Sequence, residues 1–105
     1  MEVRTFDIDG PIELRPKKIG DERGYFAETL RMNALQEHAG PIDFVQDNQS
    51  MSVRAGTVRG IHFQSHPAAQ GKLVRCLAGK LFDVAVDLRA DSPTFGRWIS
   101  TVLSP

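Results

Sequence analysis

The sequence has few of the features that mark secreted, membrane-spanning or nucleic-acid-binding proteins. Cys76 is its only cysteine, which excludes an internal disulfide and fits a reducing, cytoplasmic setting. No apolar run approaches the roughly 20 residues that cross a bilayer, and the acidic N-terminus does not resemble a secretory signal. The 13 basic residues balance 13 acidic ones, so we expect neither a nucleic-acid partner nor a membrane surface as partner.

What the sequence does contain is a series of short segments with strand character, separated by turns rich in glycine and proline. Its 105 residues are enough for one domain, residues 1–105. The pattern predicts an all-β sandwich or barrel, with edge strands within residues 1–19 and a turn at Gly20–Gly24. One helix is expected at Leu30–Ala39, ended by Gly40 and Pro41. The further expected strands are Tyr25–Thr29, Ile42–Asn48, Val58–Gln64, Lys72–Leu77, Leu81–Leu88 and Arg97–Leu103.

Residues 58–87 carry the side chains of greatest chemical interest. The first of its three expected strands holds Arg59 and His62, the second holds Lys72 and the third holds Asp83. A base, two cations and a carboxylate on neighbouring strands are what proton abstraction beside a carbonyl requires. The stretch therefore predicts the working face of a sugar-modifying isomerase.

Each of these residues also has an ordinary structural interpretation. Asp83 and Asp87 share one face of their strand, and they are either solvated there or directed into a polar cavity. His62, between two apolar residues, is often a hydrogen-bonded structural histidine, and Lys72 is an exposed lysine at the start of a strand. Arg59 and His62 share a cavity only if the strand is irregular, for example through a bulge at the intervening glycine.

Other chemistries find little support in the pattern. His62 and His66 are four residues apart, but Pro67 rules out a helix there and no third ligand is near in the sequence. We therefore expect no metal site. No serine lies in a nucleophile elbow, and no glycine-rich stretch matches a phosphate-binding loop.

Six motifs, taken together and in order, resemble one family. The chain is similar to the dTDP-4-dehydrorhamnose 3,5-epimerases, and the likeness covers nearly its whole length. The motifs are Gly20–Gly24 with Phe26 and Glu28, Phe44–Asn48, Arg59–Gln64, Gln70–Arg75, Phe82–Arg89 and Ser92–Gly96.

The resemblance implies a cupin-like jelly roll that acts as a homodimer without metal or other cofactor. The implied substrate is dTDP-4-dehydro-6-deoxy-glucose, epimerised at C3 and C5 to dTDP-4-dehydro-rhamnose. His62 matches the general base of the family, and Lys72, with Arg59 beside it, matches the group that supports the enolate. Asp83 completes the expected catalytic set.

The resemblance also implies a binding set for the nucleotide and its diphosphate. In the family, N-terminal strands cross to the partner subunit, so Arg23 and Glu28 are expected to serve the neighbouring site. The residues of the binding set are Arg23, Phe26, Glu28, Gln46, Asn48, Arg59 and Lys72.

The chain departs from the family pattern in its later part. Family members continue beyond position 105 with a tyrosine that donates the returning proton and an aspartate that orients the base. Tyr25, the only tyrosine here, lies in the wrong motif for that role. We therefore expect an incomplete jelly roll, and weak or no activity from these 105 residues alone.

Two alternatives to a two-centre epimerase remain open. One is a non-catalytic module that binds a sugar nucleotide. The other is a one-centre epimerase or ketoisomerase, which shares the barrel and differs in where the proton returns.

Overall fold

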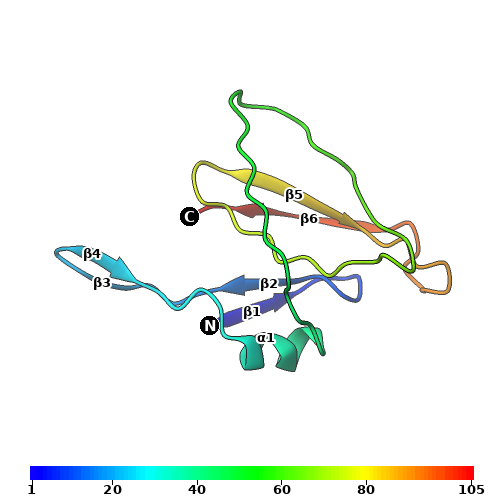
Figure 1. Ribbon diagram of the computed structural model, residues 1–105, viewed down its shortest axis with the longest axis horizontal. Helices are drawn as coiled ribbons and strands as arrows, with labels where there is room; N and C mark the ends of the chain where they lie inside the picture. The colour runs from blue at the N-terminus through cyan, green and yellow to red at the C-terminus, as the bar shows by residue number, and fades with distance from the viewer.

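The computed structural model describes residues 1–105 and contains three separate two-stranded antiparallel sheets and one helix (Figure 1). The first sheet pairs β1 with β2, the second β3 with β4, and the third β5 with β6. The strands β1–β4 and the helix α1 lie in the first 39 residues, and β5 and β6 lie in the last 25. Their bounds are β1 Glu2–Thr5, β2 Ile12–Arg15, β3 Ile19–Asp21, β4 Gly24–Phe26, α1 Met32–Ala39, β5 Leu81–Val86 and β6 Trp98–Leu103.

Several elements expected from the sequence are confirmed to within one or two residues at their ends. The helix begins at Met32 instead of Leu30, and it ends where Gly40 takes a φ of 78° and donates its N–H to the Gln36 carbonyl. Glycine is suited to this left-handed position because it has no Cβ. Leu35 is the buried residue of this helix.

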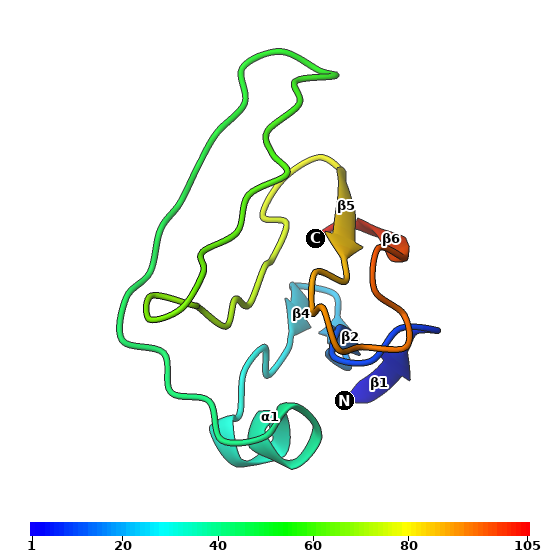
Figure 2. The ribbon, with the colours of Figure 1, turned by 90° about the vertical axis from the view of Figure 1, so that its right-hand side faces the viewer.

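The expected strands Ile42–Asn48, Val58–Gln64 and Lys72–Leu77 are wrong, because no strand lies between Ala39 and Leu81. Only two backbone–backbone hydrogen bonds form within residues 41–80, Thr57 to Arg54 and Ala68 to Ser65. Alternation of apolar residues reports which side chains suit a strand, but a strand also needs a neighbour for its N–H and C=O groups. In both views the green part of this segment extends away from the sheets as a long loop, and its yellow-green end returns to them before β5 (Figures 1 and 2).

The first and third sheets are joined by a buried carboxylate. Glu13 of β2 is 7% exposed, accepts a hydrogen bond of 2.5 Å from the Thr101 hydroxyl of β6, and pairs with Arg15 at 2.6 Å. Arg4 of β1 lies 3.5 Å from the same carboxylate. The Thr101 hydrogen bond and the Arg15 guanidinium hold the pKa of Glu13 below its ordinary value, although burial opposes them.

A second buried carboxylate, Asp87, organises the connection from β5 to β6. It accepts hydrogen bonds from the hydroxyls of Ser92 and Thr94 at 2.5 and 2.6 Å, and its side chain pairs with Arg89 at 2.9 Å. These hydrogen bonds, that of Arg89 first, lower the pKa of Asp87 well below its usual range. The solvated alternative is therefore wrong for Asp87, whereas Asp83 is half-buried opposite Thr101.

We expect Asp87→Asn to lower the thermal unfolding midpoint at pH 7, because an amide replaces the charge that Arg89, Ser92 and Thr94 hold. The pKa of Asp87 is lower in the folded state than the ordinary value near 4. Its contribution to stability is therefore present above about pH 4 and is lost as pH falls further. The difference between variant and parent should shrink below pH 4, as followed by circular dichroism.

The matched control is Asp91→Asn, in the same connection but exposed. This variant should leave the thermal unfolding midpoint unchanged at pH 7 and also below pH 4. An equal loss in both variants would mean that the Asp87 contacts do not hold the connection.

Candidate functional site

The first group of candidate binding residues lies on the β3–β4 hairpin and just after it. Arg23, at the turn, pairs with Asp21 at 2.5 Å, and its backbone N–H donates to the same carboxylate at 2.8 Å. The Arg23 hydrogen bonds lower the pKa of Asp21, and Asp21 in turn raises the pKa of Arg23. Phe26 is 73% exposed, so its ring is open for contact.

Glu28 follows the hairpin and forms a two-point ion pair with Arg31, with both nitrogen–oxygen distances at 2.8 Å. This pairing lowers the pKa of Glu28. Asp21 and Arg31 were not expected as partners of the candidate residues. Opposite charges two or three positions apart are a signal that would have found both pairs.

Two further candidates, Gln46 and Asn48, contact each other. The Gln46 amide donates to the Asn48 side-chain oxygen at 2.8 Å and also to the Asp47 carbonyl at 2.8 Å. The two amides thus form one small polar unit in residues 41–80. Its outer hydrogen-bonding atoms remain available to a ligand.

Arg59 folds back onto an earlier part of the chain. Its guanidinium donates to the Ser52 hydroxyl at 3.0 Å and to the Met51 carbonyl at 2.9 Å. These partners fix the direction of the side chain without neutralising its charge. Pattern reading could not find them, because residues 51–52 carry no charge or motif that marks them as its partners.

No hydrogen bond or ion pair joins any two of the four expected catalytic residues in this structure. His62 and Lys72 are exposed, and neither takes part in a hydrogen bond or ion pair of the chain. Asp83 lies in β5 and faces Thr101 across the sheet. The sequence predicts the His62 imidazole and the Lys72 ammonium on adjacent strands. Within residues 1–105 this arrangement does not form, because neither of the two expected strands is present.

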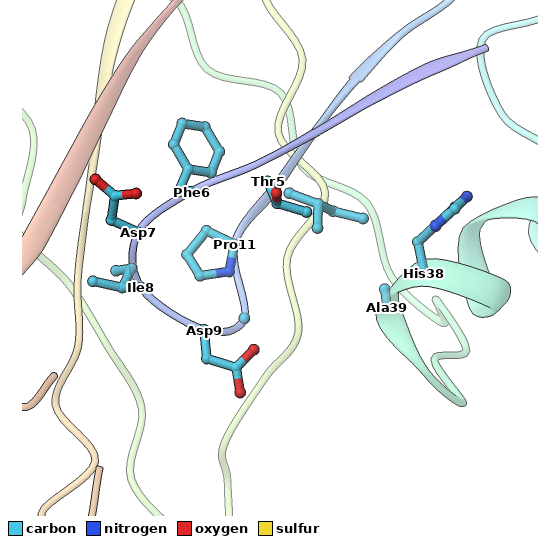
Figure 3. Close-up of a pocket in the computed structure, with 10 residues that line it drawn as sticks. Thr5, Phe6, Asp7, Ile8, Asp9, Pro11, His38 and Ala39 are labelled. Carbon is cyan, nitrogen blue, oxygen red and sulfur yellow. The ribbon is translucent and has the colours of Figure 1, made fainter. Parts of the chain in front are cut away.

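A shallow hollow of the surface lies elsewhere. It measures about 480 Å³ and is formed by residues 5–12, which connect β1 to β2, together with His38 and Ala39 of α1 (Figure 3). None of the expected site residues lines it. The side chains of Asp7 and Asp9 lie on opposite sides of the connecting turn.

No three histidine, cysteine, aspartate or glutamate side chains group closely enough to hold a metal ion. None of the helical structure is long and apolar enough to cross a membrane.

Comparison with known proteins places the motifs and the geometry in one family. The family model for dTDP-4-dehydrorhamnose 3,5-epimerase matches residues 5–105. The chain belongs to the dTDP-4-dehydrorhamnose 3,5-epimerase family. The Shigella flexneri epimerase is 49% identical over 99% of this chain and 58% of its own length. The Sinorhizobium fredii epimerase is 56% identical over 87% of this chain and 47% of its own length.

The backbones of solved epimerase structures superpose closely on that of this chain. The Mycobacterium tuberculosis epimerase superposes with a TM-score of 0.92 and 44% identity, over 99% of this chain and 52% of its own. The Legionella pneumophila epimerase, solved with dTDP-4-keto-L-rhamnose, gives 0.88 and 48% identity, over 98% of this chain and 54% of its own. The expected fold class, an incomplete all-β cupin-like domain, is confirmed. The chain spans about half the length of the relatives it matches.

The β3–β4 hairpin that carries Arg23 depends on Gly24, whose φ of 135° is unfavourable for any residue with a Cβ. We expect Gly24→Ala to destabilise the hairpin by about 1–3 kcal/mol. Amide hydrogen exchange of Ile19–Phe26 should then become faster.

Gly20→Ala is the matched control on the facing strand. Gly20 has no positive φ, and a Cβ there would meet the Gly24 carbonyl oxygen at 3.4 Å, an ordinary contact. Equal acceleration of exchange in both variants would contradict the role given to the Gly24 backbone.

Proposed function

We propose that this chain supplies the base and much of the substrate-binding surface of a dTDP-4-dehydrorhamnose 3,5-epimerase. The observation that carries the proposal is family membership over residues 5–105, together with identities near 50% to named epimerases. The Bacillus anthracis epimerase, solved with TDP and pyrophosphate, matches with a TM-score of 0.81. The proposed substrate is accordingly dTDP-4-dehydro-6-deoxy-glucose.

In the proposed reaction, His62 removes the protons from C3 and C5, which both adjoin the C4 ketone. Such a carbon acid is weaker than an imidazolium by more than ten pKa units, a gap of about 15 kcal/mol at 1.36 kcal/mol per unit. A histidine alone does not bridge that gap. Positive charge at the developing C4 oxyanion is needed, because preorganised electrostatics is usually the largest catalytic contribution.

Lys72 and Arg59 are the proposed source of that charge, and Asp83 is the proposed fourth member of the catalytic set. The structure supports Arg59 in this role, because hydrogen bonds to neutral groups, the Ser52 hydroxyl and the Met51 carbonyl, hold a guanidinium that keeps its full charge. The reaction so described needs no metal or other cofactor. The proton that returns to the opposite face must come from a group outside His62 and Lys72.

The proposed binding set consists of Arg23, Phe26, Glu28, Gln46 and Asn48, with Arg59 and Lys72. The β3–β4 hairpin, to which Arg23 and Phe26 belong, extends away from the rest of the chain (Figure 1). Ile19, Tyr25 and Phe26 on that hairpin are 59–73% exposed. An apolar arm of this kind suits exchange between the subunits of a homodimer, and we propose a homodimer as the assembly. We propose the cytoplasm as its location.

The 105 residues, which we take as part of a single domain, should have little activity alone. His62 and Lys72 are exposed and unpartnered, so neither is preorganised around a substrate. A normal rate of epimerisation by the isolated chain would contradict this expectation.

Replacing His62 tests the role of the base. In a chimera where this chain replaces the matching part of the Shigella flexneri epimerase, we expect His62→Asn to lower kcat by about 10²–10⁴-fold, the range typical of general-base loss. His66→Asn, four residues along, should leave kcat unchanged. The reaction is measured by the incorporation of deuterium from heavy water into the substrate.

The position of the deuterium label separates the candidate functions. Label at both C3 and C5 supports the two-centre epimerase. Label at one carbon indicates a one-centre enzyme, and no label with retained substrate binding indicates a binding module.

Lys72→Met tests the proposed oxyanion partner in the same chimera. Loss of one preorganised donor should lower kcat by about 10²–10³-fold, with a smaller change in KM. Lys80→Met, at another exposed lysine, serves as the control. If the two variants have equal kcat values, Lys72 does not stabilise the enolate.

A further inference from the structure

The loop that leads into Arg59 is closed by hydrogen bonds at its tip and at its base. At the tip, the Thr57 hydroxyl and backbone N–H donate to the Arg54 carbonyl at 2.7 and 3.4 Å. At the base, the Arg59 guanidinium donates to the Met51 carbonyl and to the Ser52 hydroxyl, eight and seven positions earlier in the chain. The loop is therefore a closed turn whose base is held by a cationic side chain.

These contacts use one edge of the Arg59 guanidinium. Nε donates to Ser52 Oγ at 3.0 Å, and Nη2 donates to the Met51 carbonyl at 2.9 Å. The adjoining edge, made of Nη1 and the second hydrogen of Nη2, forms no hydrogen bond within the chain. Two parallel N–H groups on one edge of a guanidinium match the oxygens of a phosphate, and they also converge on a single enolate oxygen.

The neutral partners of Arg59 set it apart from Arg23, another cation of the expected site. Arg23 is paired with Asp21, so a carboxylate already balances its charge. Arg59 takes part in none of the ion pairs of the chain. A cation that is held in one direction and keeps its charge is what electrostatic preorganisation requires.

Of the two groups that hold Arg59, only the Ser52 hydroxyl depends on the identity of a side chain. The Met51 contact comes from a backbone carbonyl, which any residue at that position supplies. The Ser52 contact comes from a hydroxyl, which accepts a hydrogen bond without adding a charge. An acid in its place would balance the guanidinium, and an alanine would release it.

We propose that Ser52 is a positioning residue for Arg59. Its hydroxyl fixes the Nε and Nη2 edge of the guanidinium, so that the edge made of Nη1 and Nη2 meets an anionic oxygen of the ligand. That oxygen belongs to the diphosphate of the sugar nucleotide or to the enolate formed at C4. The inference rests on the proposed function, in which Arg59 belongs to both the catalytic set and the binding set.

The first measurement reports the position of the guanidinium and needs no catalytic activity. In the chimera with the Shigella flexneri epimerase, hydrogen exchange at Arg59 Nε is followed by nuclear magnetic resonance. Ser52→Ala should accelerate this exchange by about tenfold, because the Nε–H loses its acceptor. Ser52→Thr keeps a hydroxyl and should restore slow exchange. The matched control is Ser65→Ala, at another exposed serine close by in the chain, which should leave the exchange unchanged.

The second measurement reports the effect on the ligand. Ser52→Ala should lower kcat/KM by about tenfold, the effect of one hydrogen bond to a charged group, and Ser52→Thr should restore most of it. When Arg59→Met is already present, Ser52→Ala should cause no further loss, because the group that Ser52 positions is gone. A loss of affinity for dTDP assigns the oxygen to the diphosphate. A loss of kcat with unchanged dTDP affinity assigns it to the enolate.

Three outcomes would overturn the inference. Equal Nε exchange in Ser52→Ala and Ser65→Ala would mean that the hydroxyl does not hold the guanidinium. An equal loss of kcat/KM on Ser52→Ala, with and without Arg59→Met, would mean that Ser52 acts on the fold of the loop. Faster exchange with unchanged kcat/KM and dTDP affinity would mean that the direction of Arg59 does not matter to the ligand. An inactive chimera contradicts the proposed function instead, and Nε exchange with dTDP affinity then decides the role of Ser52.

Discussion

The arrangement of the first and third sheets depends on the hydrogen bond between the Thr101 hydroxyl and the buried Glu13 carboxylate. The first and third sheets are each only two strands wide, and isolated two-stranded sheets are marginal in water. Through the Thr101 hydroxyl this buried group connects them, joining residues 88 positions apart in the chain, and Arg15 of the same strand balances its charge. A buried charge requires such partners, because an unpaired one is costly to desolvate. The same requirement fixes which face of β2 can lie against β6.

The elements that the sequence predicts well are those whose partners are close in the chain. The helix from Met32, the hairpin around Gly24 and the strands β5 and β6 all find their hydrogen bonds within about 25 residues. Glycine at the turns and alternation along β5 are local signals, so they could be read without the structure. The strand ends differ from the expected ones by one to three residues, because pairing, which propensity does not encode, decides where a strand stops.

The predictions that did not hold concern distant partners. Val58–Gln64 has the composition of a strand, yet within these residues it has no neighbour to pair with. Asp87 was expected on a solvated or cavity face, whereas the Ser92 and Thr94 hydroxyls and Arg89 enclose it. The candidate site also depends on distant partners. The motifs identify His62, Lys72 and Arg59, but of these only Arg59 has side-chain hydrogen-bond partners in the structure. A motif specifies chemistry, while the approach of two side chains depends on the packing of the whole sheet.

The pairing of Arg23 with Asp21 has a consequence for how an anion would arrive. A guanidinium already matched by a carboxylate presents a dipole rather than a net charge, and the field of a dipole decays quickly with distance. A diphosphate approaching the hairpin would feel little attraction until it is within direct reach. It would then displace the carboxylate from the same two nitrogens. If the hairpin binds a diphosphate as proposed, binding would proceed by short-range exchange of one acid for another, with a rate that depends little on ionic strength.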